Sequence, residues 1–230
     1  MGETVGIQSN GETAQGYLAL PAAGRGPAVM VVQEWWGLVP QIKDVCDALA
    51  GEGFVALAPD LYRGEIAEHT EMDKAGHLMS TLPMERAARD MGAAVDFLRN
   101  HEAVAGEKVG VVGFCMGGML TLVVAAQQGD KIGAAVPYYG APLGDAAPDW
   151  SGLSAPVHGH YAADDSFFPA DAVKALEAQL QGMGKDVHLD VHADCGHAFT
   201  NPANVFGTYD PELTADTWSQ TVEFLHEKLG

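Results

Sequence analysis

The sequence VGVVGFCMGG, residues 109–118, indicates the fold of this chain and its chemistry. Its first six residues form an apolar run rich in valine, which is typical of a strand buried inside a sheet. The residues Met116–Gln128 are almost wholly apolar and predict a buried helix directly after it. Cys115 therefore lies at a sharp turn from strand to helix. Gly113 and Gly117 suit this turn, because larger side chains two residues before and after Cys115 would collide.

Strands and helices alternate on both sides of this turn. Short apolar runs predict strands over Ala28–Gln33, Phe54–Ala58, Val109–Phe114, Ala134–Tyr139, Val157–Tyr161 and Val187–Val191. Apolar residues at helical spacing predict helices around Ile42–Leu49 and over Leu82–Asn100, Met116–Gln128, Ala170–Met183 and Pro211–Lys228. Between Pro59 and about Thr81 the chain is polar, with no predicted element. We expect one α/β domain over residues 1–230, with a mostly parallel central sheet and helices on both faces in three layers.

Composition and charge exclude several classes of protein. The chain has 12 Lys and Arg against 31 Asp and Glu, a net charge of −19 that repels nucleic acids. No apolar run approaches the roughly 18 residues of a membrane span, and residues 1–6 lack the features of a signal peptide. The 3 cysteines suggest no disulfide framework and no metal site. We therefore expect a cytoplasmic monomer that acts on a small molecule without metal or other cofactor.

Cys115 is the candidate nucleophile. At the start of a helix, backbone N–H groups and the positive end of the helix dipole favour a thiolate. The N–H of Met116 would then donate one hydrogen bond to an oxyanion. The alternative is an inert buried cysteine, with glycines that serve only close helix packing.

His197 and Asp165 are the candidate general base and its orienting acid. In a parallel sheet, ligand-binding residues lie just after the carboxyl ends of strands, where His197 and Asp165 both stand. The chain order Cys115, Asp165, His197 is that of α/β-hydrolases. Asp164 competes with Asp165 for the acid's role, and Asp194 is a weaker rival.

A further acid follows the first predicted strand. Glu34 stands beside Trp35, whose backbone N–H is the second expected donor of the oxyanion hole. The chain here resembles the dienelactone hydrolases, also called carboxymethylenebutenolidases, over most of its length. The resemblance is carried by the segments Gln33-Glu34-Trp35-Trp36-Gly37, Pro59-Asp60-Leu61-Tyr62, Gly113-Phe114-Cys115-Met116-Gly117-Gly118, Asp165-Ser166-Phe167-Phe168-Pro169 and Gly196-His197-Ala198-Phe199.

The resemblance implies an α/β-hydrolase fold with Cys115, Asp165 and His197 as a catalytic triad. It also implies that Glu34 pairs with the resting thiol and takes its proton when substrate binds. A salt bridge or a loop cap is the alternative role for Glu34. The expected reaction is hydrolysis of an enol lactone or activated ester through a thioester, because a thiol adduct reverts unless its leaving group departs easily.

The substrate pocket is where the chain departs from its family. Members that bind dienelactone hold its carboxylate with two arginines, one of them four residues after the catalytic histidine, where this chain has Asn201. We therefore expect a less anionic substrate, in an aromatic pocket formed by Trp35, Trp36, Tyr138 and Phe199, together with Asn201. For these aromatic residues, ordinary core packing is an equal alternative. Two other functions stay open: a general carboxylesterase or thioesterase with the same triad, and a non-catalytic redox or ligand sensor that uses Cys115.

Overall fold

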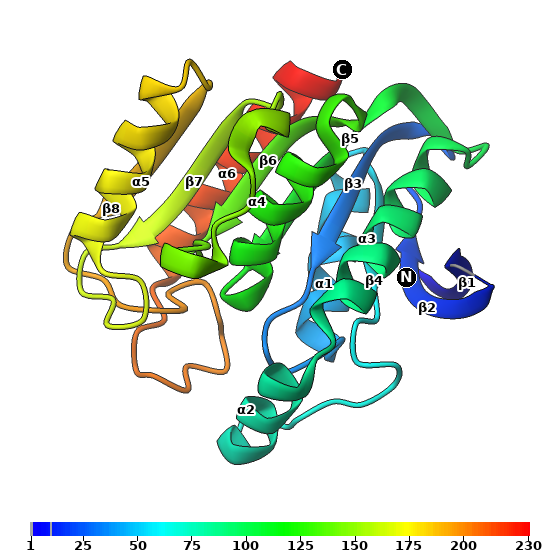
Figure 1. Cartoon of the computed structure of the whole chain (residues 1–230). Coiled ribbons are helices and arrows are strands. Elements are labelled where there is room, and N and C mark those ends of the chain that lie inside the picture. Colours follow the sequence, from blue (N-terminus) through cyan, green and yellow to red (C-terminus); the bar gives the residue numbers. More distant parts are fainter. Residues whose placement is uncertain (1, 10) are drawn as a thin grey trace.

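A single sheet lies at the centre of the molecule (Figure 1). The computed structural model describes residues 2–9 and 11–230. In these residues the strands are β1 (Glu3–Ser9), β2 (Glu12–Ala19), β3 (Gly26–Val32), β4 (Val55–Pro59), β5 (Val104–Phe114), β6 (Ile132–Tyr138), β7 (Val157–Ala162) and β8 (Val187–His192). Their order across the sheet is β1-β2-β4-β3-β5-β6-β7-β8. All strands from β4 to β8 run parallel, whereas β1 and β2 are antiparallel.

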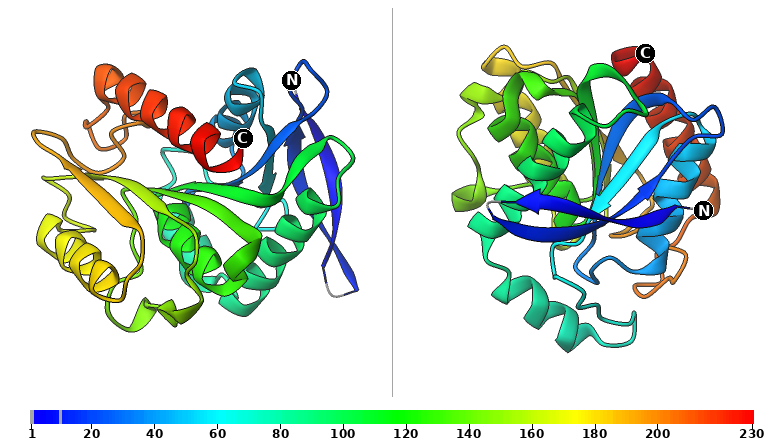
Figure 2. Two further views of the ribbon diagram at one scale, coloured as in Figure 1. Left: turned by 90° about the horizontal axis from the view of Figure 1, so that it is seen from above. Right: turned by 90° about the vertical axis from the view of Figure 1, so that its right-hand side faces the viewer.

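Helices cover both faces of the sheet. On one face lie α1 (Pro40–Gly51) and α6 (Pro211–Leu229), and on the other lie α3 (Met84–Arg99), α4 (Met116–Gln128) and α5 (Ala170–Gly182) (Figure 2). The predicted three-layer α/β arrangement is therefore confirmed. No helix in the described part of the chain combines the length and apolar character needed to cross a bilayer.

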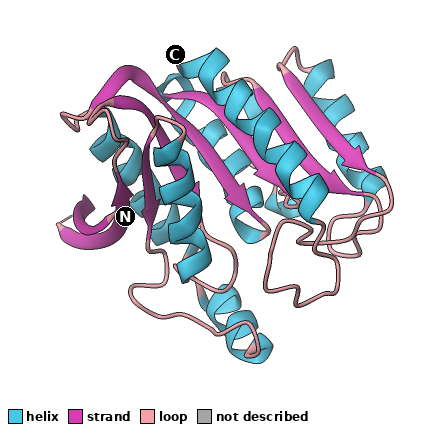
Figure 3. Ribbon diagram, turned by 180° about the vertical axis from the view of Figure 1, so that it is seen from behind, coloured by secondary structure: helices cyan, strands magenta, loops and turns pink. Residues whose placement is uncertain are grey.

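Burial on both faces explains the continuous apolar sequence of the parallel strands. Every residue of β4 and β6 is buried, and in β3 only Pro27 is partly exposed. The register places Val32 of β3 opposite Gly113 of β5, and Phe114 of β5 opposite Tyr138 of β6. The carboxyl ends of these strands thus lie side by side. The loops that follow them gather along this edge (Figure 3).

Three elements differ from the sequence-based expectation. The strands β1 and β2 form an edge hairpin, and many of their residues are exposed, so their apolar pattern is weak. Helix α2 (Met72–Thr81) lies within the stretch for which no element is predicted. Only Ala75 and Leu78 of α2 are buried, which leaves too narrow an apolar stripe to reveal a helix. It projects beyond the carboxyl edge of the sheet (Figure 1).

Candidate active site

Cys115 occupies a strained turn between β5 and α4. Its φ of +54° is uncommon for a residue other than glycine. A Cβ atom on Gly113 would lie 2.2 Å from the carbonyl oxygen of Gly117, and one on Gly117 would lie 2.2 Å from that of Val32. The turn therefore requires both glycines, as their spacing predicts. Backbone strain of this kind is concentrated at functional sites.

His197 lies between Cys115 and Asp165. Its Nε2 atom is 3.2 Å from the Cys115 Sγ atom, and its Nδ1 atom is 2.7 Å from the Oδ2 atom of Asp165. The neighbouring strands β7 and β8 lead into the loops that carry Asp165 and His197, which explains why the two side chains meet. Both are nearly buried, with exposed fractions of 5% and 6%. The structure thus brings together the three side chains that the sequence indicates as candidate nucleophile, base and acid.

The backbone fixes the orientation of Asp165. Its Oδ1 atom accepts hydrogen bonds from the N–H groups of Phe167 and Phe168, at 2.7 and 3.1 Å. Asp164 and Asp194 are both exposed. In the described part of the chain, neither of them forms an ion pair or hydrogen bond with His197. The geometry therefore favours Asp165 over its two rivals.

Opposing effects act on the thiol of Cys115. Burial raises the pKa of this thiol well above its usual value, and the charge of Glu34 raises it further. Hydrogen bonds from the backbone N–H groups of Met116 and Trp35 lower it. Burial and the charge of Glu34 thus favour the neutral form of the thiol. The two N–H groups face the sulfur, where they can also reach an oxyanion formed beside it.

Glu34 is a buried carboxylate with two side-chain partners. It is only 1% exposed. Asn201 donates a hydrogen bond of 2.8 Å to its Oε2 atom, and the hydroxyl of Tyr139 donates one of 3.5 Å to its Oε1 atom. Burial raises the pKa of Glu34 to about 7, although both hydrogen bonds lower it. At neutral pH both protonation states of this carboxyl are therefore populated.

The thiol contacts His197 rather than Glu34 in this conformation. No hydrogen bond between Glu34 and the Cys115 sulfur is found among the described residues. The family resemblance implies such a pairing, so the structure differs from that expectation. The reason is that Asn201 and Tyr139 engage the two oxygens of Glu34. The charge of Glu34 still raises the pKa of the Cys115 thiol.

Tyr139 is a site residue that the sequence analysis missed. It directly follows β6, has a φ of +35°, and is fully buried. Besides contacting Glu34, its hydroxyl lies 2.5 Å from the Oγ1 atom of Thr200. Its position after a central parallel strand is the same signal that indicates Glu34 and Cys115.

A cavity of about 430 Å³ opens beside the sulfur. Methionine and aromatic side chains dominate its walls, which are formed by Trp35, Met79, Ser80, Met84, Cys115, Met116, Met119, Phe167, Phe168, His197 and Phe206. Two of the methionines, Met79 and Met84, come from the end of α2 and the start of α3. The cavity is therefore suited to an apolar ligand.

Of the residues predicted for the substrate pocket, Trp35 lines this cavity, whereas Trp36, Tyr138, Phe199 and Asn201 are not among its described lining residues. Trp36 is 2% exposed, and its ring packs edge-on against His69. Tyr138 and Phe199 are buried in the core, and Asn201 donates a hydrogen bond to Glu34. Core packing, the alternative considered for the aromatic residues, accounts for all three.

The nearby arginines are engaged away from the cavity. Arg63 pairs with the buried carboxylate of Asp90 at 2.8 Å. Arg86 donates a hydrogen bond of 3.0 Å to the carbonyl oxygen of Leu61. Arg89 lies at the surface, 3.8 Å from a carboxylate of Glu85. No Lys or Arg is among the described residues that line the cavity.

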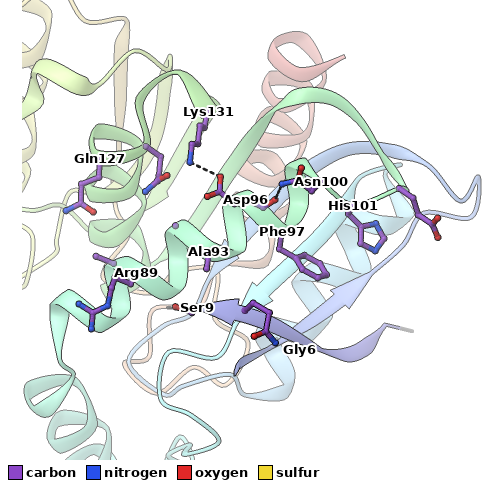
Figure 4. Close-up of a pocket in the computed structure, with 15 residues that line it drawn as sticks. Gly6, Ser9, Arg89, Ala93, Asp96, Phe97, Asn100, His101, Gln127 and Lys131 are labelled. Atoms are coloured by element: carbon purple, nitrogen blue, oxygen red, sulfur yellow. Dashed lines mark hydrogen bonds and ion pairs between the residues drawn. The ribbon is translucent and has the colours of Figure 1, made fainter. Parts of the chain in front are cut away.

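A larger hollow, of about 1140 Å³, lies elsewhere on the molecule (Figure 4). It is an open depression between β1, α3 and the end of α4, with Asp96 and Lys131 paired across part of it (Figure 4). None of its described lining residues belongs to the cluster around Cys115. Size alone therefore does not identify the candidate active site.

Comparisons with known proteins identify the family. Residues 14–229 match the dienelactone hydrolase family. The chain is 38% identical to Protein usf of Aquifex pyrophilus and 36% identical to an Aquifex aeolicus protein assigned as a carboxymethylenebutenolidase. Each match covers 100% of this chain and 100% of the relative. A solved structure of a Klebsiella pneumoniae protein, assigned as a dienelactone hydrolase, matches with a TM-score of 0.83 and 28% identity over 98% of each chain.

This protein therefore belongs to the dienelactone hydrolase family and has the α/β-hydrolase fold, as the sequence motifs predict. Its class is that of the carboxylic ester hydrolases.

Proposed function

We propose that Cys115, His197 and Asp165 form a catalytic triad that hydrolyses an uncharged enol lactone or activated ester. The observation that carries this proposal is the chain of contacts from sulfur to imidazole to carboxylate, at 3.2 and 2.7 Å. An imidazole held between a nucleophile and a carboxylate is arranged to accept the proton of the nucleophile. The carboxylate then stabilises the charged ring.

In the first half of the proposed reaction, the sulfur of Cys115 attacks the acyl carbon and its proton passes to Nε2 of His197. The carbonyl oxygen becomes an oxyanion, which the N–H groups of Met116 and Trp35 stabilise. The bond to the leaving oxygen then breaks. That oxygen takes the proton from His197, and the acyl group remains on Cys115 as a thioester.

In the second half, water attacks the thioester while His197 removes one of its protons. The carbon–sulfur bond breaks, and this proton returns to the sulfur of Cys115. The carboxylic acid product leaves, and the resting thiol is restored. Glu34, with a pKa of about 7, is a second acceptor for the thiol proton once substrate displaces it from Asn201.

The thiol restricts the leaving group of the substrate. A thiolate leaves a tetrahedral adduct readily, so the adduct reverts unless the competing oxygen is a comparably good leaving group. Enolates and phenolates meet this requirement, whereas simple alkoxides and amines do not. We therefore propose enol lactones and aryl or enol esters as substrates, and not peptides.

The cavity supports an uncharged substrate. Its walls are apolar, and none of its described lining residues is a Lys or Arg. The chain also carries a net charge of −19, which disfavours the approach of anions. A substrate with a free carboxylate would lose its hydration in the cavity without gaining a cationic partner.

Trapping of the acyl-enzyme tests the proposal. After rapid mixing with p-nitrophenyl acetate at pH 7, intact-mass and peptide mass spectrometry should place one acetyl group on Cys115. Cys115→Ala should lose both the label and the turnover. Cys195→Ala is the matched control and should keep both, because that thiol is buried outside the cavity. Turnover that survives in Cys115→Ala would refute the proposed nucleophile.

A substrate panel tests the proposed specificity. An uncharged enol lactone should be hydrolysed with a kcat/KM at least about tenfold above that of the analogue bearing a carboxylate, because burying an unpaired charge is costly. If the two lactones had equal kcat/KM values, the cavity would have to contain a site for the carboxylate, and the proposed preference for uncharged substrates would be wrong. If acyl thioesters exceeded both lactones, the enzyme would instead be a thioesterase.

A further inference from the structure

A cluster of imidazole side chains lies on β7 and β8, apart from the residues that contact Cys115. His158 and His160 alternate along β7, and His188, Asp190 and His192 alternate along β8. The parallel register places His158 opposite His188 and His160 opposite Asp190. Because successive side chains of a strand point to opposite faces of the sheet, all five lie on the same face.

We propose that His158, His160 and Asp190 bind a divalent transition-metal ion, with Zn²⁺ as the representative. One potential ligand atom of each residue lies within 4.8 Å of those of the other two. The Nε2 atom of His158 is 2.8 Å from the Oδ2 atom of Asp190. Ligands of a tetrahedral zinc ion lie roughly 3.4 Å apart, as follows from metal–ligand distances of about 2.0–2.1 Å. Small side-chain rotations would therefore place the three atoms around one ion.

Neighbouring residues hold these ligands in place. His188 lies against the other oxygen of Asp190, with its Nε2 atom 3.0 Å from Oδ1. The hydroxyl of Thr221, from α6, lies 3.4 Å from Nε2 of His160. His192 lies on the other side of that ring, with its Nε2 atom 3.3 Å from Nδ1 of His160. The ion would take one of the two ring nitrogens of His160, and the contact at the other nitrogen would orient the ring, as outer contacts do in metal sites.

The cluster is closed on one side and open on the other. His160 is fully buried, whereas the side chains of His158 and Asp190 are 19% and 32% exposed. An ion can therefore arrive from solvent, and water can complete its coordination. Two imidazoles and one carboxylate suit Zn²⁺, Cu²⁺ or Ni²⁺ and not Mg²⁺, which prefers oxygen ligands.

The site would join the two strands that lead to the candidate acid and base. β7 ends at Ala162, shortly before Asp165, and β8 ends at His192, shortly before His197. β8 is also the edge strand of the sheet. An ion bound across both strands would therefore stabilise this end of the sheet.

Calorimetric titration with Zn²⁺ tests the proposal. Cys115→Ser serves as the background, because a thiol beside His197 is a separate potential zinc ligand. One ion should bind per chain, and the melting temperature should rise with Zn²⁺ but not with Mg²⁺. Adding Asp190→Asn or His158→Gln should weaken binding by roughly tenfold or more and remove the rise in melting temperature. The control is His77→Gln, an exposed histidine of α2, which should leave the affinity unchanged.

Three outcomes would overturn the site. The first is a lack of heat change and of thermal shift with Zn²⁺. The second is equal zinc affinity of the Asp190→Asn and His77→Gln proteins, which would place the ion elsewhere. The third is equal stabilisation by Mg²⁺, which would indicate a general ionic effect. In that case the contact of His158 with Asp190 would be a structural hydrogen bond only.

Discussion

Asn201 donates a hydrogen bond of 2.8 Å to the buried carboxylate of Glu34, which lies 167 positions earlier in the chain. The family resemblance implies an arginine at the place of Asn201, where it would bind the carboxylate of a substrate. In this protein the side chain at that position instead donates a hydrogen bond to a carboxylate of the protein itself. The hydrogen bond favours the charged form of Glu34 and so opposes the effect of burial on its pKa.

Replacing Asn201 should therefore change the pH dependence of catalysis. Asn201→Ala removes a hydrogen bond to the charged carboxylate, so the pKa of Glu34 should rise above about 7. If ionised Glu34 assists the thiol, the rise of kcat/KM with pH should move to higher pH. Profiles of p-nitrophenyl acetate hydrolysis measure this shift. Asn100→Ala, at the exposed end of α3, is the control, and identical profiles for both variants would contradict a role for the contact.

Glu34 should also make the stability of the protein depend on pH. Its pKa rises from 4.5 to about 7 on folding, so the folded state binds more protons between these values. This carboxyl therefore stabilises the folded state fully below pH 4.5. The free energy of unfolding should fall by about 3 kcal/mol as the pH rises through about 7. Urea unfolding of the wild type and Glu34→Gln at pH 4.5 and 8 measures it. The free-energy difference between the two proteins should change by that amount, and a constant difference would refute the assignment.

Asp165 and Asp164 offer a matched pair of variants. Asp165→Asn keeps the shape of the side chain but no longer stabilises the charged imidazole or its reactive tautomer, so kcat should fall by roughly 10³-fold or more. Asp164→Asn should change kcat less than about twofold, because this residue is exposed and does not contact His197. Steady-state kinetics decide between them. A larger loss in Asp164→Asn would reverse the assignment of the acid.

A cation placed in the cavity should change substrate preference. Ser80 lies in the wall at the end of α2 and is exposed, so Ser80→Arg adds a charge without burying it. The kcat/KM for a carboxylate-bearing lactone should rise about fivefold to tenfold relative to the uncharged one, as expected for about 1 kcal/mol of screened attraction. Ser80→Gln controls for size. An equal change in both variants would show that charge is not the cause.

The sequence predicts the parallel part of the fold well, because strands buried on both faces have continuous apolar runs. It also indicates Cys115, Asp165 and His197, since each follows such a strand. The edge strands and α2 lack this signal, because they bury few side chains. The missed helix also hides part of the cavity wall, namely Met79 and Ser80. A cavity wall supplied by α2 cannot be predicted while that segment is treated as a loop.

Helix α2 forms part of the cavity wall but carries none of the proposed triad residues. It contributes Met79 and Ser80 to the cavity, yet only Ala75 and Leu78 anchor it. The proposed triad residues Cys115, Asp165 and His197 instead follow strands of the central sheet. Substitutions in this one short helix could thus redirect the enzyme to new acyl groups while the reaction machinery stays intact. Divergence between relatives would then be concentrated in a segment whose loss of packing costs the fold little.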